Sequence, residues 1–397
     1  MPQVRLVGFR YHPAIGGAEQ LARRLIREIG GRMSVDVVTV VTSNRSDWLR
    51  LLVDGVRDAA ERYQVDGRDV TALPRWPPGL RRRLRLLAPF YHLPGSRIPT
   101  LMGRMLASQL EDVARPAGLV HNVFMGREAF SVGLIEAASR SRIPFVFTPL
   151  RHERPFGWNS AAFKELYRRA DAVIALSRTE ADWLIAHGAR AERTSLIGAG
   201  PLNDEHAEPE RAWQLVGRDP IVLFLGQLHT YKGFSVLLEA ARLLSDRRDV
   251  RFVFAGPDVR NHARLFRDAG PNVIYLSTVD DALRDSLLRA CTVLCVPSSR
   301  ESFGMVLVEA WNAGKPVVGG PAPATRELIE DGVDGWSVPQ DAAIVAERLR
   351  GLLDDAELAR SMGANGKKKV DTRFSWRAIA DAHLEIYSRL LAERIPV

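Results

Sequence analysis

Short apolar runs alternate with amphipathic stretches through the first half of the chain. The apolar runs predict buried strands, and the stretches between them carry apolar residues at the three- and four-residue spacing of a helix face. The predicted strands are 4–9, 35–41, 118–123, 145–148 and 172–175, and the predicted helices are 19–29, 101–114, 131–140, 160–169 and 179–187. This alternation predicts an α/β domain whose parallel sheet is covered by helices on both faces.

The alternation stops between residues 198 and 220, a stretch rich in Gly, Pro, Asp and Glu, and then begins again. We interpret this stretch, which contains a short helix near 211–216, as the connection between two domains. The second set of strands is 221–225, 250–254, 273–275, 293–296 and 316–318, and the helices are 234–244, 282–290, 303–313, 322–330 and 342–353, followed by a last helix at 376–393. We therefore expect one domain at 1–205 and another at 206–375, with the terminal segment 376–397 packing back on the first. Ligands of doubly wound sheets bind beyond the carboxyl ends of strands, so residues directly after strands are the functional candidates.

The length of 397 residues also favours two domains, because one hydrophobic core rarely serves so long a chain. The formal net charge of +8 suggests an anionic partner: nucleic acid, an anionic membrane surface or a phosphorylated substrate. Part of the charge lies in Arg75–Arg97, where basic residues mix with Leu and aromatic residues. That mixture suits a membrane interface, although a solvated loop and helix explain it equally well. No recognition motif for nucleic acid accompanies the charge, so we do not expect nucleic-acid binding.

No apolar run approaches the roughly 18 residues of a membrane span, and the start of the chain reads as a strand rather than a signal peptide. We expect a cytoplasmic protein that could associate peripherally with the inner face of the cell membrane. Cys291 and Cys295 read as parts of one strand, about 13 Å apart, which is too far for a disulfide. They are expected to be buried free thiols.

The most informative segment is Glu301-Ser302-Phe303-Gly304, which follows a predicted strand and ends in a helix carrying Glu309. The glycine lets a ligand approach the backbone, and the first N–H groups of the helix favour an anion such as a diphosphate. The two glutamates are eight residues apart, about 12 Å along a helix, so they could accept hydrogen bonds from hydroxyls of an extended ligand. A helix cap at Glu301 and a surface Glu309 without any ligand are the simpler explanation.

Gly16 and Gly17 stand where the first strand turns into a helix, and they leave the backbone open to a phosphate or an acceptor. A tight turn without a ligand is the alternative. The third glycine of the dinucleotide fingerprint is missing, so NAD and FAD are not expected. No His/Cys/Asp cluster has the spacing of metal ligands, so no essential metal is expected.

These motifs together resemble the retaining glycosyltransferases of family 4, which have the GT-B fold of two Rossmann-like, doubly wound domains facing across a cleft. The resemblance covers nearly the whole chain and rests on segments in the family's order: 11–19, 170–177, 224–233, 254–257, 301–309, 313–318 and 331–336. It implies transfer of a sugar from a UDP- or GDP-linked donor to an acceptor hydroxyl, with no cofactor besides the nucleotide sugar. The basic segment suggests a lipid-linked or phosphorylated acceptor.

The resemblance also implies roles for the donor-site residues of the second domain. Glu301 would bind sugar hydroxyls and Glu309 the ribose, with Ser302, Phe303 and Gly304 beside the donor. Lys232 would contact the diphosphate and oppose the charge that grows on the leaving group. The backbone around Val279 would hold the base.

Two positions leave alternatives open. Gln227 stands where family members usually carry an arginine, so one cation and its bidentate fork are missing, and His229 or Arg300 could supply the charge instead. The family also places a histidine of the first domain at the donor sugar. His152, just past a predicted strand, is the first candidate, and His121, at the end of another strand, is the second.

Two other functions fit the same pattern. A sugar-nucleotide epimerase of this fold is the first, although the paired glutamates and Lys232 argue against it. A donor-binding partner that lost catalysis is the second, and Gln227 favours it.

Overall fold

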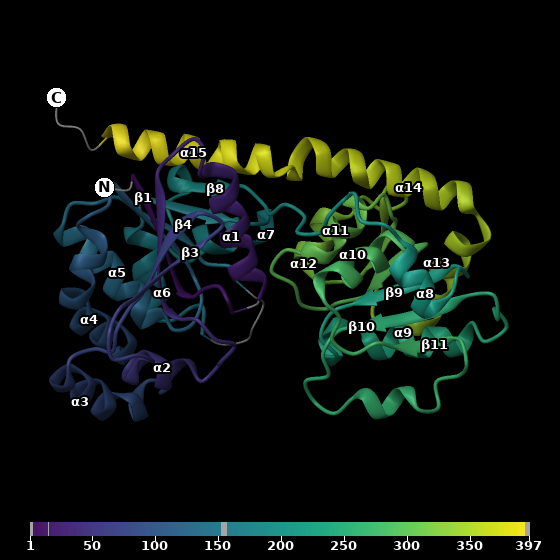
Figure 1. Cartoon of the computed structure of the whole chain (residues 1–397), viewed down its shortest axis with the longest axis horizontal. Helices are drawn as coiled ribbons and strands as arrows, with labels where there is room; N and C mark the ends of the chain where they lie inside the picture. Colours follow the sequence, from purple (N-terminus) through teal and green to yellow (C-terminus); the bar gives the residue numbers. More distant parts are fainter. Residues whose placement is uncertain (1–2, 15, 152–156, 394–397) are drawn as a thin grey trace. The chain divides into compact units, whose positions relative to one another are not determined.

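A computed structural model of the protein describes residues 3–14, 16–151 and 157–393. The chain divides into two compact units, one formed by Met1–Gly198 with Ile379–Val397 and the other by Ala199–Ala378. Each unit is a mainly parallel sheet covered by helices (Figure 1). The prediction of two Rossmann-like α/β domains is therefore confirmed. No helix of the described ranges is both long enough and apolar enough to cross a membrane.

The first unit contains a sheet of eight strands in the order β3-β4-β2-β1-β5-β6-β7-β8. The strands are β1 (Val4–Arg10), β2 (Val35–Val41), β3 (Glu61–Val65), β4 (Arg68–Ala72), β5 (Leu119–Val123), β6 (Phe145–Thr148), β7 (Ala172–Ala175) and β8 (Thr194–Leu196). All neighbours are parallel except β3 and β4. The strand order reverses between β1 and β5, which makes their carboxyl ends the switch point of this sheet.

The helices of the first unit follow the predicted positions closely, with α2 and α3 in addition. They are α1 (Gly17–Ile29), α2 (Trp48–Asp54), α3 (Pro78–Leu87), α4 (Ile98–Ala114), α5 (Glu128–Arg140), α6 (Ala161–Arg169) and α7 (Arg178–Ala186), with the short 3₁₀ turns η1 (Ala88–Phe90) and η2 (Ala191–Arg193). From Ile379 onward, helix α15 (Trp376–Glu393) belongs to this unit.

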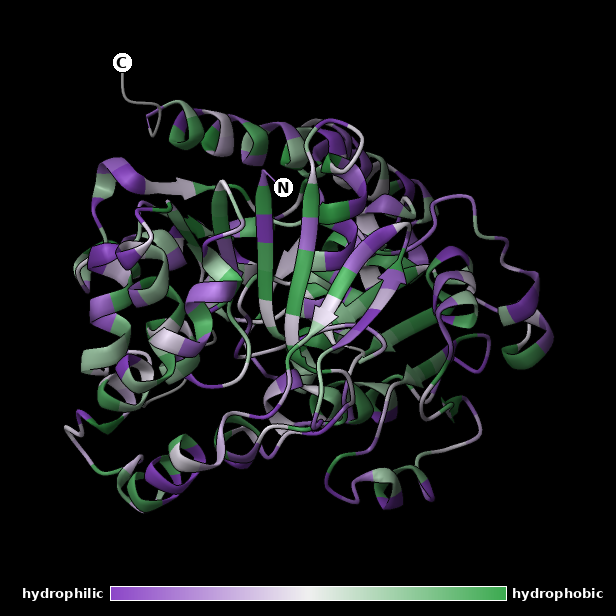
Figure 2. Ribbon diagram, turned by 60° about the vertical axis from the view of Figure 1, so that its left-hand side comes forward, coloured by the Kyte–Doolittle hydropathy of each residue, from purple (hydrophilic) through white to green (hydrophobic). Residues whose placement is uncertain are grey.

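The second unit has six parallel strands in the order β11-β10-β9-β12-β13-β14. They are β9 (Ile221–Leu225), β10 (Arg251–Ala255), β11 (Val273–Tyr275), β12 (Val293–Val296), β13 (Val317–Gly319) and β14 (Gly335–Ser337). Numbered within the unit, this is the 3-2-1-4-5-6 order of a Rossmann fold, with its switch point between β9 and β12. The strands are almost wholly apolar, because helices cover both faces of the sheet. Figure 2 shows the same property in the first unit, where much of the central strands beside the N-terminus is green.

The helices of the second unit are α8 (Glu210–Val216), α9 (Phe234–Leu243), α10 (Asp281–Ala290), α11 (Met305–Asn312), α12 (Pro323–Leu328), α13 (Ala342–Asp354) and α14 (Ala356–Lys369), with 3₁₀ turns η3 (Thr230–Lys232) and η4 (Ala263–Phe266) and a π-helix η5 (Val370–Phe374). Aspartates cap three of them: the side chains of Asp280, Asp341 and Asp355 accept hydrogen bonds from free N–H groups of the first turn.

Two sequence predictions about local structure are wrong. The helix predicted at 303–313 begins at Met305, after Gly304 in a left-handed conformation, and Glu301 lies in the loop before it, as expected. The 12 Å estimate for the two glutamates assumed a continuous helix and does not apply. Cys291 caps the end of α10 and only Cys295 lies in a strand, although both thiols are buried and free, as expected.

Candidate functional site

The switch point of the second sheet brings two predicted motifs together. The loop after β9 carries Lys232, and the loop after β12 carries Glu301. The two strands are neighbours, with Leu294 paired to Leu223. In sheets with this strand order, ligands bind beyond the carboxyl ends of the strands at the switch point. Lys232 and Glu301 therefore lie where a doubly wound sheet binds its ligand.

Lys232 and Glu301 contact each other directly. The Lys232 Nζ donates a hydrogen bond to the Glu301 Oε1 at 2.6 Å. Both side chains are largely buried, with 22% of the lysine and 12% of the glutamate exposed. The ammonium also lies 5.7 Å from the centre of the Tyr231 ring, at a distance where the ring face attracts a cation. One cation and one anion thus share a small, partly dry site.

The loops around this ion pair approach each other backbone to backbone. Gly233 has a left-handed conformation with φ 78°, and an added Cβ would overlap the carbonyl of Pro297. Gly320 faces the backbone of Ser298 in the same way. Any side chain at either glycine would push the loops apart, so glycine is needed for the close approach.

The entrance to α11 presents backbone rather than side chains. Gly304 caps the helix with φ 106° and ψ 44°, which leaves the first N–H groups of α11 without partners inside the helix. The Phe303 side chain is 2% exposed and packs edge-on against Phe374, so it belongs to the core. The predicted contact of Phe303 with the donor can therefore involve only its backbone. The expectation that Leu307 and Val308 are core residues is confirmed.

Glu309 is buried, with 6% of the residue exposed, so the simpler alternative of a surface glutamate is wrong. Burial raises the pKa of its carboxyl to about 7, while the nearby Arg284 and the backbone N–H of Leu202 lower it. Its main-chain carbonyl accepts a hydrogen bond from the Asn203 amide at 3.1 Å. The Glu309 carboxylate accepts a hydrogen bond from the N–H of Leu202, and a ribose hydroxyl bound there would donate to the same carboxylate.

Gln227 is exposed, and its contacts do not indicate what its side chain does. Its carbonyl accepts a hydrogen bond from the N–H of His229, whose ring stacks on Tyr231 at 5.0 Å. Burial, followed by nearby Arg260, lowers the pKa of His229, which leaves the imidazole a weaker cation at neutral pH. Arg300 is exposed beside the loop of Glu301.

Val279 lies in the segment that follows β11, and β10 separates β11 from β9 in the sheet. The residue is half-buried. Ser277, two residues before it, has φ 56°, and its carbonyl accepts the N–H of Gly256, which ties this segment to the loop after β10. The predicted base contact stays a prediction.

Gly16 and Gly17 lie at the switch point of the first sheet, where β1 leads into α1. Gly16 is extended, and an added Cβ would overlap the buried ion pair of Arg10 with Glu19. Gly17 begins α1, and an added Cβ there would have no atom within 4 Å. Gly16 is therefore needed for local packing, whereas Gly17 borders open space that a ligand can enter.

The two candidate histidines differ in what the structure says of them. His152 lies outside the described residues. His121 is fully buried in β5, where its Nδ1 is 2.6 Å from the hydroxyl of Tyr387 and its Nε2 is 2.8 Å from the hydroxyl of Thr148. Both ring nitrogens are occupied by protein groups and no surface of the ring is exposed. This corrects the expectation that His121 could face a sugar: it joins α15 to the first sheet.

A second buried histidine beside this cluster predicts a pH-dependent stability. Burial lowers the pKa of His383 to about 4, and burial followed by the proximity of His383 lowers that of His121. The unfolded chain binds more protons between pH 6.5 and 4, so the stabilising contribution of His383 is complete above pH 6.5 and is lost as the pH falls toward 4. The loss is about 2 kcal/mol between pH 8 and pH 5.

Urea unfolding at both pH values checks this prediction, with His383→Leu as the comparison. Between pH 8 and pH 5, the free energy of unfolding of wild type should fall by about 2 kcal/mol more than that of the variant. The comparison is needed because Glu180 and Glu309, whose pKa values burial raises to about 7, act in the opposite direction. Equal losses in wild type and variant would contradict the assignment.

Several residues of the two units, each considered separately, gave no signal in the sequence. Arg284 and Asp285 form an ion pair next to Glu309, and Gln340 donates hydrogen bonds to the loops of Lys232 and Glu301. Glu180 is buried and accepts the N–H of Arg151 at 2.6 Å. A serine three residues before Glu180 forms a helix-capping pattern that could have drawn attention to it. For the others, only the three-dimensional contacts reveal the role.

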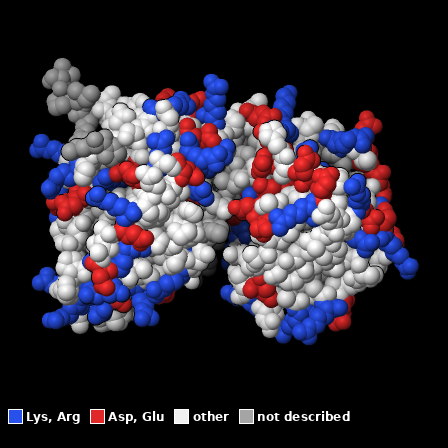
Figure 3. All heavy atoms as spheres, viewed as in Figure 1, with Lys and Arg blue, Asp and Glu red and all other residues white. Residues whose placement is uncertain are grey.

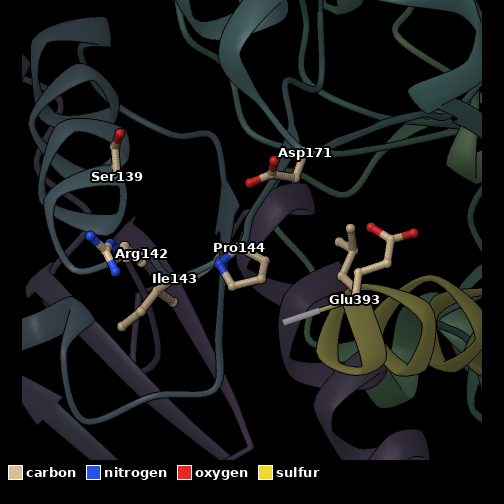
Figure 4. Close-up of a pocket in the computed structure, with 7 residues that line it drawn as sticks. Ser139, Arg142, Ile143, Pro144, Asp171 and Glu393 are labelled. Carbon is tan, nitrogen blue, oxygen red and sulfur yellow. The ribbon is translucent and has the colours of Figure 1, made fainter. Parts of the chain in front are cut away.

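A cavity of about 340 Å³ lies elsewhere in the first unit (Figure 4). It is lined by Ser139, Arg142, Ile143, Pro144, Asp171, Leu390 and Glu393. Pro144 and Asp171 directly precede β6 and β7, so the cavity borders the amino ends of the strands, opposite to the edge where doubly wound sheets bind ligands. Across the described ranges, no group of three or more His, Cys, Asp and Glu residues could hold a metal ion.

Two family models match the chain in the order of its units. Residues 16–200 match the Glycosyl transferase 4-like domain, and residues 207–369 match Glycosyl transferases group 1. The chain belongs to the group 1 glycosyltransferases. The match to the second model includes Lys232, Glu301 and Glu309.

Relatives of this group 1 glycosyltransferase include transferases whose names contain an inositol compound. The phosphatidyl-myo-inositol mannosyltransferase of Mycolicibacterium smegmatis is 34% identical over 181 residues, which are 44% of this chain and 47% of the relative. The chain thus spans about half the length of that relative. The D-inositol 3-phosphate glycosyltransferase of Nocardia farcinica is 27% identical over 353 residues, or 80% of this chain and 77% of the relative.

Solved structures show that the group 1 glycosyltransferase has the GT-B fold. The Anabaena HepE structure in complex with UDP and glucose aligns with 98% of this chain and 100% of HepE, at a TM-score of 0.73 and 21% identity. Sucrose-phosphate synthase from Thermosynechococcus elongatus aligns over 98% and 100% of the two chains, at a TM-score of 0.72 and 20% identity. At these identities the alignments establish the fold alone.

Proposed function

We propose that the protein transfers a sugar from a nucleoside diphosphate sugar to an acceptor hydroxyl. The observation that carries the proposal is the contact between Lys232 and Glu301 at the switch point of the second sheet. A sugar diphosphate needs a cation for its phosphates and acceptors for its hydroxyls, and this site offers both within one hydrogen-bond length. The family to which the chain belongs supports the same activity.

Each group at the site has a proposed task. Lys232 and the first N–H groups of α11 bind the diphosphate and stabilise the negative charge that grows on it as the glycosidic bond breaks. Glu301 accepts hydrogen bonds from the sugar hydroxyls, which orients the anomeric carbon. Glu309 accepts those of the ribose, and backbone near Val279 holds the base. We propose retention of configuration, as in family 4, with no metal ion required.

UDP is the donor nucleotide that we favour, because the similar Anabaena protein has been solved in complex with UDP and with UDP-glucose. For the acceptor we propose a phosphorylated polyol or a lipid-linked one. Two relatives are named for phosphatidyl-myo-inositol and D-inositol 3-phosphate, and the net charge of +8 favours an anionic acceptor.

A screen of nucleotide sugars tests the proposal. Purified protein is incubated with UDP- and GDP-linked hexoses, and release of the nucleotide diphosphate is followed with and without EDTA. We expect slow hydrolysis of at least one donor, unaffected by EDTA and faster with a phosphorylated polyol. An epimerised sugar formed without acceptor would favour the epimerase, and tight binding of a donor in calorimetry without any turnover would favour a catalytically inactive partner.

A basic and apolar surface on the first unit supports a membrane-associated acceptor. We define the α3 surface as Arg82, Arg83, Arg85, Leu86, Phe90 and Leu93, all exposed on α3 and the turn after it. Leu86 is 69% exposed, Phe90 51% and Leu93 54%, which is unusual for large apolar side chains. Helix α3 contains no acidic residue, and Lys and Arg side chains gather at the lower left of Figure 3, where Figure 1 places this helix.

We propose that the α3 surface binds anionic lipid on the cytoplasmic side of the cell membrane. Each arginine contributes about 1 kcal/mol to the free energy of binding to an anionic lipid surface. The exposed leucines and phenylalanine can enter the interfacial region of the membrane. Arg85 is paired with Asp54, so the charge available for lipid comes mainly from Arg82 and Arg83.

Replacing Arg82 and Arg83 by glutamate should weaken binding to vesicles of phosphatidylcholine and phosphatidylglycerol at least about 30-fold. Co-sedimentation at low salt measures the effect. The control, Arg360→Glu with Lys368→Glu, makes the same charge change on exposed residues of α14 and should bind like wild type. If both double variants lose binding equally, the attraction is a matter of net charge and the α3 surface has no special role.

A further inference from the structure

Three loops at the carboxyl edge of the second sheet meet at the side-chain amide of Gln340. Its Nε2 donates to the carbonyl of Tyr231 at 3.1 Å and to the carbonyl of Pro297 at 2.8 Å. Tyr231 directly precedes Lys232 in the loop after β9. Pro297 begins the loop after β12 that carries Glu301. Gln340 itself follows β14, which lies two strands away from β12 in the sheet.

The carbonyl of Tyr231 is close to several hydrogen-bond donors besides the amide of Gln340. It receives the N–H of Ser299 at 2.7 Å and lies within hydrogen-bond distance of the hydroxyls of Ser298 and Ser299 at 3.2 and 3.3 Å. The two serines belong to the loop that also carries Glu301. The amide of Gln340 adds a connection to a third element and contacts both loops at once.

The position of Gln340 is fixed by the helix that follows it. The next residue, Asp341, caps α13 by accepting the N–H groups of Ala343 and Ile344 at 2.9 and 3.2 Å. Helix α13 packs against α9, which begins directly after the loop of Lys232. A rigid helix pair therefore holds the amide over the two loops, although the side chain itself is exposed.

We infer that Gln340 is a positioning residue that sets the separation of Lys232 and Glu301 for the donor. This inference rests on the proposed function. The amide has no need to touch the substrate. It fixes the carbonyls of Tyr231 and Pro297, and through them the two loops that carry the ion pair. Misplacing a charged group by 1 Å costs as much as 100-fold in rate, so a small relaxation of these loops has a large effect.

Gln340→Met removes the two donated hydrogen bonds and keeps the size of the side chain. We expect kcat/KM for the donor to fall about tenfold or more, with the midpoint of thermal unfolding close to that of wild type, because water replaces hydrogen bonds of an exposed amide at little cost. Gln340→Glu, which has the same shape but only acceptors at neutral pH, should not recover the activity. Gln64→Met is the matched control, since Gln64 is exposed and its amide hydrogen-bonds Asp69 in the first unit.

A double-mutant cycle separates positioning from general weakening of the fold. If Gln340 acts through Lys232, the effect of Gln340→Met on kcat/KM should shrink to about twofold when Lys232 is already Met, since residues coupled through one hydrogen-bonded backbone segment are not additive. Additive effects would overturn the inference while leaving the proposed function intact. Absence of donor turnover by wild type, under all conditions of the screen, would overturn both.

Discussion

Replacing Lys232 by methionine or Glu301 by glutamine is expected to lower sugar transfer at least about 100-fold, while only the lysine variant loses affinity for UDP. Both residues are placed to interact more strongly with the transition state than with the bound donor, and the loss of one such interaction typically costs two to three orders of magnitude. The two side chains form one ion pair, yet they have different proposed partners in the donor.

The different effects of the two substitutions on UDP affinity follow from that ion pair. Lys232→Met removes the cation and should weaken UDP binding at least about tenfold. Glu301→Gln removes the carboxylate that occupies Lys232 at 2.6 Å, so the ammonium becomes more available to the diphosphate. UDP should then bind as tightly as in wild type or up to about fivefold more tightly, the range of a partly exposed ion pair.

Isothermal titration with UDP and initial transfer rates measure the two effects on the same preparations. Arg350→Met is a suitable control, because it breaks an exposed ion pair with Asp246 at 2.9 Å in the same unit without touching the site. Full transfer activity in Glu301→Gln would remove the residue from the donor site. Unchanged UDP affinity in Lys232→Met would show that the diphosphate binds elsewhere.

Gly320→Ala is expected to destabilise the second unit by about 1–3 kcal/mol and to lower transfer about tenfold or more. Gly320 follows β13, and an added Cβ would overlap the backbone of Pro297 and Ser298. Backbone cannot turn away as a side chain does, so the loop that carries Glu301 has to move.

Gly351→Ala provides the matched control for this substitution. Gly351 lies inside α13, where an added Cβ would have no atom within 4 Å. Alanine should therefore stabilise the helix by about 0.5–1 kcal/mol. Urea unfolding and transfer rates of both variants check the pair of predictions, and a Gly320→Ala protein as stable and active as wild type would contradict the close approach seen in the loops.

The sequence predicted the central parallel strands of both sheets well because buried parallel strands are short, continuous apolar runs. The parallel edge strands β8 and β14 were missed, because each has only three residues and is not a continuous apolar run. The edge hairpin was missed for the opposite reason. Strand β3 contains Glu61, Arg62 and Gln64, all exposed, so it carries no apolar run. The Asp66-Gly67 pair between β3 and β4 has φ values of 50° and 72° and is a known hairpin signal that could have revealed the turn.

The donor-site residues were found in the sequence because their chemistry is local to a motif. Lys232 and Glu301 each follow a strand, and the parallel sheet brings such positions to one edge. Burial was harder to predict. Phe303 lies in the loop before α11 and packs against Phe374, and Glu309 is on a buried face of α11. The sequence pattern does not show which elements cover these two side chains.

Contacts between distant segments were beyond the sequence. Gln340 lies about a hundred residues from Tyr231, and no local pattern marks an amide that donates to carbonyls of other loops. His121 illustrates the same limit. Its place at the end of a strand suggested access to a ligand, whereas Tyr387 covers it from the far end of the chain.

The contact of His121 with Tyr387, 266 residues apart in the chain, has a consequence for the order of folding during synthesis. The second unit is one continuous segment, 199–378, and all of its strands leave the ribosome before α15 does. The fold of the first unit is completed later, because the side chain of His121 can contact Tyr387 only after residues 379–393 have been translated. The later-synthesised half can therefore complete its fold before the half that was made first.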